Sequence, residues 1–448
     1  MTAAERTGAL GLLDLGRDEG AARRGLDGVA RGLRGGRHGV RVPAGCPLGP
    51  EDLPAAVDTV LLADPGAHTA GRVAAWAAAG GRPRVWAEVT GPAEALAAVA
   101  AGARGLVAKG HEAGGRVGGA TTFVLLQQLL ADPRLAEVPV LAYGGIGRHT
   151  AAAAVAGGAA GVLLDVQLAL TAEGEPGLPA EVVDALRAMD GSETRLADGH
   201  RVYARPGLTP PKGPVAALLG ARDLRGQLLP VGQDGASAAR LAARYRTTAG
   251  VLQAVRAAVT GHLETAVRSR PLGRPLAVAQ GPMTRVSDRA AFAAAVAAEG
   301  GVPYLALAVM QGPDVRRLLA ETSERLGDLP WGVGLLGFAP PELRREQLAA
   351  VAGVRPPYAV IAGGTPAQAA PLEAAGTRTH LHVPSPGLLE RYLAEGARRF
   401  VFEGLECGGH VGPRASFPLW EEQIERLLAC PEPESLDVLF AGGVHDAR

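Results

Sequence analysis

The feature that most constrains the fold of this chain is an internal repeat of short apolar runs separated by Ala-rich runs. Three glycine-containing landmarks recur along the 448 residues at offsets of 293, 294 and 298 positions. The matched pairs are Gly39-Val40 with Gly332-Val333, Gly102-Ala103-Arg104 with Gly396-Ala397-Arg398, and Gly144-Gly145 with Gly442-Gly443. Because a nearly constant offset through several landmarks is hard to obtain by chance, we expect two copies of one supersecondary arrangement.

Each copy contains seven short apolar runs of the kind expected for strands that are buried on both faces. In the first copy the predicted strands are Gly8–Leu15, His38–Val42, Thr59–Ala63, Arg84–Val89, Gly105–Lys109, Val138–Tyr143 and Gly161–Val166. In the second copy they are Leu276–Gln280, Pro303–Val309, Gly332–Leu336, Tyr358–Ala362, Thr379–Val383, Arg399–Glu403 and Val438–Ala441. Runs of helical length lie between them, so the alternation predicts parallel β-α units.

Eight such units close a (β/α)8 barrel, typically of about 250 residues. The repeat offset maps the opening strand of the second copy to a position before Met1, and the closing strand of the first copy to a position past Arg448. We therefore expect tandem TIM-type (β/α)8 barrels in a piece of a longer chain, the second barrel being truncated. The expected domains are a first repeat at 1–170, a helical appendage and linker at 171–270, and a second, incomplete repeat at 271–448.

Composition argues against several classes of function. The 45 Lys and Arg residues balance the 45 Asp and Glu residues, which argues against a nucleic-acid-binding surface. The three cysteines cannot form a disulfide framework, which favours a reducing compartment. No stretch is long and apolar enough to cross a bilayer, and the N-terminus lacks an apolar targeting segment. We expect a cytoplasmic α/β protein that binds neither nucleic acid nor membrane.

Two glycine-rich loops follow equivalent predicted strands. In the second copy, Phe400–Ser416 reads FVFEGLECGGHVGPRAS, and in the first, Gly105–Gly119 reads GLVAKGHEAGGRVGG. When Gly404 is aligned with Gly110, six of eleven positions match, and His410 falls on Arg116. Glycines allow backbone N–H groups to approach a ligand closely, so the loops predict binding sites, although glycine-rich loops are often only tight turns.

His410 is the candidate catalytic residue of the second loop. Imidazole titrates near neutral pH, so it can accept a proton from a substrate carbon or give one back. The simpler alternative is that His410 only hydrogen-bonds the loop. Glu406, Cys407 and His410 lack a second ligand pair at zinc-like spacing, so we predict no metal site, and Cys407 is expected to pack as a small thiol. Lys109 and Glu403 end equivalent predicted strands of the two copies and carry opposite charges. Each side chain could contact a ligand or be solvated.

Two further motifs accompany the loop G-x-E-x-G-G-H-x-G: Gln280-Gly281-Pro282-Met283 after the first strand of the second copy, and Gly442-Gly443 after its seventh. This combination resembles the nitronate monooxygenase (2-nitropropane dioxygenase) family, which includes FMN-dependent enoyl reductases of fatty-acid and polyunsaturated-acid synthesis. The likeness covers both copies. The sequence is also similar to flavin domains attached to type I polyketide synthase-like proteins.

The resemblance implies that the second copy binds FMN and that His410 is its catalytic base or proton donor. The FMN phosphate would be held by the last glycine pair, and Glu403 stands where the family usually has a flavin-contacting Gln. The implied cofactor-binding positions are Gly281, Pro282, Met283, Glu403, Gly408, Gly409, Gly442 and Gly443.

The first copy matches the cofactor-binding pattern only in part. Its matching positions are Gly114, Gly115, Gly144 and Gly145. Arg116 replaces the histidine, and Asp165 stands near the place of a second phosphate-binding loop, where a carboxylate would repel phosphate. We therefore expect the first barrel to be degenerate, structural or partner-binding.

Three functions remain open. The first, implied by the resemblance, is an FMN-dependent oxidoreductase of nitronate monooxygenase type, in which His410 deprotonates a small-molecule substrate and O2 reoxidises the flavin. The second is an FMN-dependent enoyl-thioester reductase with NAD(P)H as electron donor, acting on an acyl thioester beside an acyl carrier protein or other megasynthase domains. The third is a non-catalytic scaffold domain of a megasynthase. No GxGxxG motif follows a strand, so no Rossmann nicotinamide domain is predicted.

Overall fold

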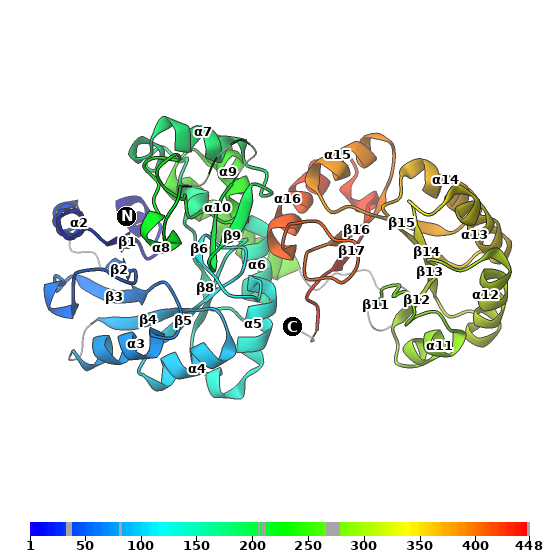
Figure 1. Cartoon of the computed structure of the whole chain (residues 1–448), viewed down its shortest axis with the longest axis horizontal. Coiled ribbons are helices and arrows are strands. Elements are labelled where there is room, and N and C mark those ends of the chain that lie inside the picture. The colour runs from blue at the N-terminus through cyan, green and yellow to red at the C-terminus, as the bar shows by residue number, and fades with distance from the viewer. Residues whose placement is uncertain are drawn as a thin grey trace. The chain divides into compact units, whose positions relative to one another are not determined.

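The chain forms two compact units in a computed structural model (Figure 1). The structure describes residues 1–32, 38–79, 83–204, 207, 209, 211–265 and 278–445. Unit 1 comprises Met1–Glu264, Pro413–Glu421 and Gly443–Arg448, and unit 2 comprises Thr265–Gly412 and Glu422–Gly442. Residues 276–277 of a predicted strand and parts of the predicted linker lie outside the described residues.

Unit 1 contains a parallel sheet of seven strands in the order β1-β2-β3-β4-β5-β7-β8. The strands are β1 (Leu12–Asp14), β2 (His38–Val42), β3 (Val57–Leu62), β4 (Arg84–Val89), β5 (Gly105–Lys109), β7 (Val140–Tyr143) and β8 (Gly161–Val162). The helices of this repeat are α1 (Thr2–Arg6), α2 (Glu19–Gly32), α3 (Thr69–Ala78), α4 (Pro92–Ala100), α5 (Thr122–Ala131) and α6 (Arg148–Ala156).

Unit 2 contains a second parallel sheet of seven strands, in the order β11 to β17, and helices α11–α15 lie along its outer side (Figure 1). The strands are β11 (Ala279–Gln280), β12 (Val302–Ala306), β13 (Gly332–Leu336), β14 (Tyr358–Ala362), β15 (Arg378–His382), β16 (Arg399–Glu403) and β17 (Asp437–Ala441). The helices are α11 (Ala290–Ala298), α12 (Gly312–Leu326), α13 (Pro341–Val354), α14 (Pro366–Ala374), α15 (Pro386–Ala394) and α16 (Ser416–Leu428), whose first residues belong to unit 1.

The two sheets confirm the predicted fold class of tandem TIM-type β/α repeats. Every residue of β5 and of β12 is buried, as expected for parallel strands covered on both faces. Six of the predicted strands agree with the structure at both ends. Strands β1 and β8 are shorter than predicted, and each sheet has seven strands among the described residues. In the same part of the chain, no helix combines the length and the apolarity needed to cross a membrane.

The segment after the first repeat is not the purely helical appendage that was predicted. It contains α7 (Ala180–Ala188), α8 (Val215–Leu218), α9 (Ala238–Tyr245) and α10 (Thr248–Thr265), but also strands β9 (Thr194–Ala197) and β10 (His200–Tyr203). These two strands form an antiparallel sheet with β6 (Gly115–Arg116), which lies in the glycine-rich loop of the first copy. The pairing was missed because β9 and β10 are only four residues long and β6 only two.

Candidate functional site

The carboxyl ends of the unit 2 strands lie on one rim of the sheet, where barrel enzymes place their reactive groups. His410, in the loop after β16, lies against Phe338, in the loop after β13, with ring centroids 4.8 Å apart and planes at 56°. Phe338 is 56% exposed, and His410 is exposed as well. The phenyl ring lies over Gly363 at the end of β14, since a Cβ there would be 2.9 Å from it. His410 therefore reaches other loops of the same rim.

The loop Gly281-Pro282-Met283 occupies the same rim at the start of the sheet. The backbone N–H of Tyr304 donates to Oε1 of Gln280 (3.3 Å), which fixes the start of this loop on β12. Pro282 packs on Gly334 in β13, where a Cβ would lie 2.3 Å from the Pro282 ring. Met283 is 43% exposed, so it offers an apolar, flexible surface to a ligand.

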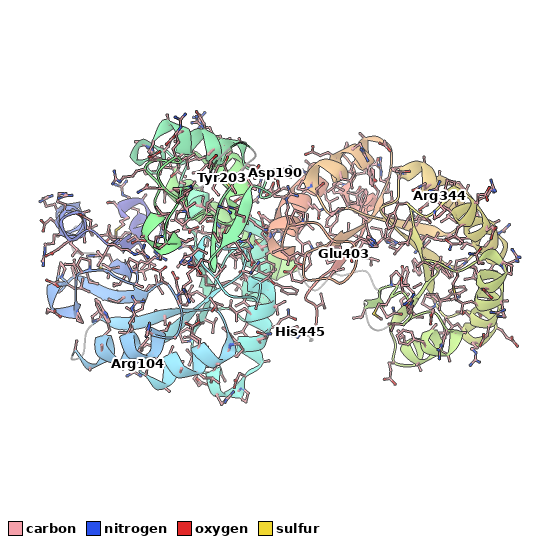
Figure 2. All side chains as sticks on the ribbon, in the orientation of Figure 1. Arg104, Asp190, Tyr203, Arg344, Glu403 and His445 are labelled. Carbon is pink, nitrogen blue, oxygen red and sulfur yellow. The ribbon has the colours of Figure 1, made fainter. Side chains whose placement is uncertain are left out.

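Glu403 and His382 end the neighbouring strands β16 and β15, and Figure 2 labels Glu403 at its strand end. Nδ1 of His382 lies 2.9 Å from Oε2 of Glu403, and the two side chains are 14% and 13% exposed. Both atoms are buried without a hydrogen-bond partner, because the angle at this distance falls outside hydrogen-bond geometry. The pair is an electrostatic contact at the carboxyl end of the sheet.

Cys407 lies beside this pair. Burial, and then the negative charges of Glu403 and Glu406, raise the pKa of the Cys407 thiol to about 12. The thiol is therefore expected to stay protonated near neutral pH.

Three glycines on this rim leave their backbone open. An ideal Cβ on Gly281, Gly408 or Gly409 would meet no atom within 4 Å. Gly409 has φ +92°, a conformation that only glycine adopts without strain. Gly412, three residues later in the same loop, is tightly packed instead. A Cβ there would lie 2.9 Å from the carbonyl oxygen of Pro384, so this end of the loop packs against the protein.

The predicted phosphate-binding turn of the second copy keeps the backbone of its counterpart. Gly442 and Gly443 have φ values of +114° and +73°, and Gly144 and Gly145 have +116° and +65°. Gly442 belongs to unit 2, whereas Gly443 belongs to unit 1, where its carbonyl accepts from Nε2 of Gln127 (2.7 Å). Because the pair is divided between the two units, its role in binding phosphate stays a prediction.

In the first copy, the protein itself covers the predicted glycine loop. A Cβ on Gly114 would lie 2.7 Å from the carbonyl of Pro230. Gly115 and Arg116 form strand β6, which pairs with β10: Gly115 lies opposite Arg201, and Arg116 lies opposite His200. No open backbone comparable to Gly408 and Gly409 is therefore left at Gly114.

The glycine turn of the first copy is also occupied by side chains of unit 1. The backbone N–H of Gly145 donates to Oδ2 of Asp234 (3.2 Å). Burial, together with the charges of Asp165 and Glu112, raises the pKa of Asp234 well above its usual range, so the neutral acid is favoured. A Cβ on Gly145 would lie 2.6 Å from the ring of Pro418.

The helix that follows this turn is capped by a carboxylate from α16. The backbone N–H groups of Arg148, His149 and Thr150, at the start of α6, donate to the oxygens of Glu421 over 2.8 to 3.0 Å. Glu421 is only 2% exposed. A helix start after this strand is the usual phosphate position of the fold, and in unit 1 a protein carboxylate fills it.

Charged side chains also fill the interior of the unit 1 sheet. Lys109 and Glu88, both 0% exposed, form an ion pair of 3.1 Å, and Glu88 pairs with Arg41 at 3.0 Å. Burial alone would raise the pKa of Glu88, but the charges of Arg41 and Lys109 outweigh it and lower the value to about 2. Lys109 was expected either to contact a ligand or to be solvated. It does neither, because its ammonium group is buried against the carboxylate of Glu88. Asp165 accepts a hydrogen bond from the hydroxyl of Tyr143 (2.5 Å).

Sequence reasoning missed two members of the unit 2 rim. Phe338 carried no motif, and His382 was placed in a strand without a role. The signal that could have found both is their position, since each lies at or just beyond the carboxyl end of a predicted parallel strand. The contacts of Phe338 with His410 and of His382 with Glu403 could not be predicted from the sequence, because they join residues from different strands and loops of the sheet.

No family model and no curated protein matches the chain at the level of sequence. Among solved structures, FabK from Thermotoga maritima is similar with 20% identity and a TM-score of 0.48, over 59% of this chain and 89% of FabK. Nitroalkane oxidase from Streptomyces ansochromogenes is similar with 21% identity and a TM-score of 0.33, over 38% of this chain and 59% of that protein. Likenesses at this level carry no residue's role over to this chain.

Proposed function

We propose that unit 2 binds FMN on the carboxyl rim of its sheet and catalyses an oxidoreduction of nitronate monooxygenase type. The observation that carries this proposal is the exposed pair of His410 and Phe338 beside the open backbone of Gly408 and Gly409. An isoalloxazine is a flat ring with apolar faces and a polar edge, so an exposed aromatic side chain and free backbone N–H groups suit it.

The other side chains of the rim fit the same ligand. Met283 offers an exposed apolar contact, and Pro282 is held in place by Gly334. Glu403 would place a carboxylate near the flavin, and its Oε2 faces Nδ1 of His382 at 2.9 Å. FMN, when bound, would accept or deliver a hydride. His410 would remove a proton from the substrate carbon and hold it, in contact with solvent, until the next turnover.

A second candidate function is the reduction of an enoyl thioester, delivered as a small molecule or by an acyl carrier protein and with NAD(P)H as electron donor. The observation that favours it is the exposed apolar surface around the rim, where Val286 and Val309 are 51% and 67% exposed. An acyl chain would cover such a surface. In this reaction His410 would protonate the product carbon.

The absorbance spectrum of the purified chain, before and after incubation with FMN and removal of free flavin, tests the proposal. We expect retained flavin, and weaker binding in Phe338→Ala and Gly409→Val. The matched control is Arg116→Ala, which changes the position in unit 1 equivalent to His410 and leaves binding unchanged. A chain that retains no flavin under any of these conditions would refute the proposal and favour a scaffold.

If flavin binds, two assays separate the two reactions. O2 uptake with a nitronate supports the first, and NAD(P)H consumption with an enoyl thioester supports the second. His410→Ala is expected to lower kcat by about 100-fold or more in the reaction that the chain performs, because a positioned general acid or base contributes that much.

A further inference from the structure

The rim of unit 2 carries a second imidazole besides His410, and a carboxylate faces it. His382 ends β15 and Glu403 ends β16, and these strands are hydrogen-bonded neighbours. Nδ1 and Oε2 are 2.9 Å apart, and both side chains are more than four-fifths buried. The pair does not meet the geometry of a hydrogen bond, but a carboxylate this close to one ring nitrogen favours a proton on that nitrogen by its charge.

The distance fixes where the neutral imidazole carries its proton. If Nδ1 were unprotonated, its lone pair would face a carboxylate oxygen at 2.9 Å and the two acceptors would repel each other. The proton must therefore be on Nδ1, and Nε2 is then the basic nitrogen. Nδ1 is buried, so the remaining exposure of the ring, 14% for the side chain, lies elsewhere on it.

The thiol of Cys407 does not compete with His382 for a proton. With a pKa of about 12, its thiol stays protonated near neutral pH and can only donate toward Glu403. The carboxylate thus interacts with both the protonated thiol and the imidazole.

One layer lower, the same sheet contains a similar pair that serves as a comparison. His380, two residues earlier on β15, is fully buried, and its Nε2 lies 3.4 Å from Oδ2 of Asp437, the first residue of β17. The contact with His380 holds the pKa of Asp437 below its usual range. The His380–Asp437 pair lies closer to the amino ends of the strands, where residues of this fold serve stability. The His382–Glu403 pair lies at the carboxyl ends, where barrel enzymes place their reactive groups.

We propose that His382 is a proton-transfer residue of unit 2 and that Glu403 is its positioning residue. The inference rests on the proposed function, since FMN supplies the oxidant or reductant. In the oxidative direction, Nε2 of His382 would take the substrate proton in place of His410: an N–H bond forms, the C–H bond breaks, and its electron pair stays on the carbon. The imidazolium that results is stabilised by the charge of Glu403.

The first test reads the position of the proton directly and needs no cofactor. The ten histidines are labelled with 15N, and the signal of His382 is identified by its loss in His382→Gln. We expect the neutral ring of His382 to carry its proton on Nδ1, and in Glu403→Met to revert to the Nε2–H form that dominates in free histidine. His380→Gln, the matched control, leaves the His382 signal unchanged. A neutral His382 with its proton on Nε2 in the unaltered chain overturns the role of Glu403.

The second test measures the reaction in the FMN-loaded chain. We expect His382→Gln to lower kcat by about 100-fold with little change in bound flavin, and His380→Gln to lower it by less than about twofold. A chain that binds FMN and keeps its kcat in His382→Gln overturns this inference and leaves the proposed function intact. A chain that binds no FMN overturns the proposed function itself, whatever the position of the proton on His382.

Discussion

At the scale of single residues, the two units treat their buried charges differently. In unit 1, Lys109, Glu88 and Arg41 neutralise one another inside the sheet. In unit 2, the equivalent strand end carries Glu403, whose charge is directed at His382 on the rim. Buried ion pairs seldom increase stability over apolar residues of the same size, but they become costly when one partner is removed. We therefore expect the unit 1 network to affect stability, whereas in the unit 2 pair the carboxylate faces only Nδ1 of His382.

Cys407 gives a prediction at this scale. Because burial and the charge of Glu403 raise the pKa of its thiol from 9.0 to about 12, the thiolate fraction at pH 8 is about a thousandfold lower than for an ordinary thiol. We expect iodoacetamide to alkylate Cys407 correspondingly slowly in the folded chain, as measured by mass spectrometry of its peptide. Glu403→Met should speed the reaction. A folded chain in which Cys407 reacts within tenfold of its rate in urea would contradict the prediction.

Residue positions were predicted better than residue contacts. The sequence placed Glu403, His410 and Gly409 at strand ends and in the loop where the structure has them, because strand ends follow from apolar runs and glycines. It could not pair Phe338 with His410, or Lys109 with Glu88, because those contacts depend on which loops and strands become neighbours in the sheet.

At the scale of elements, α6 and α16 show how unit 1 differs from the pattern of its fold. The start of α6 is a natural anion site, and the carboxylate of Glu421 accepts three of its backbone N–H groups. Gly147 belongs to the same arrangement, since a Cβ there would lie 2.1 Å from the Glu421 carboxyl carbon. This contact could not be predicted from the amino-acid sequence, because Glu421 and His149 are 272 positions apart.

Glu421→Ala is expected to destabilise unit 1 by about 3 kcal/mol, because the N–H groups at a buried helix start lose a charged acceptor. Glu421→Gln, which keeps one oxygen acceptor, should cost about half as much. Urea unfolding followed by tryptophan fluorescence measures the effect, with Trp420 adjacent to the change. Glu193→Ala is the control, since Glu193 accepts from Asp190 and Gly191 at a partly exposed turn where water can replace it. Equal losses in the two variants would show that Glu421 has no special role.

At the scale of the whole molecule, the apolar pattern was sufficient to predict two parallel seven-stranded sheets. It was not sufficient for the segment after the first repeat, where short antiparallel strands pair with the glycine loop. Pairings between a two-residue strand and a distant hairpin leave no periodic trace in the sequence. The structural difference between the two glycine loops was therefore only partly predictable, through Arg116 in the position of His410.

The acid stability of the whole chain provides a further prediction. The pKa of Glu88 is about 2 in the folded protein and near 4.5 when unfolded, so the folded state holds its proton less tightly. This group contributes stability that is complete above pH 4.5 and is lost as the pH falls from 4.5 toward 2, in total about 3 kcal/mol. Urea midpoints measured across this range should fall less steeply in Glu88→Gln, which starts from a lower stability. Parallel curves for both proteins would contradict the prediction.

The matched glycine pairs have a consequence for inferring ancestry. The turns at Gly144-Gly145 and Gly442-Gly443 share their left-handed backbone, although in the first the N–H of Gly145 is engaged by Asp234. A residue with a side chain at either position would strain the turn whether or not a ligand is bound. Mutation can thus erase a binding site while the backbone still forbids any change to its glycines. A glycine pair of this kind can therefore be kept for its conformation alone, so a search that counts glycine motifs will find turns as well as binding sites.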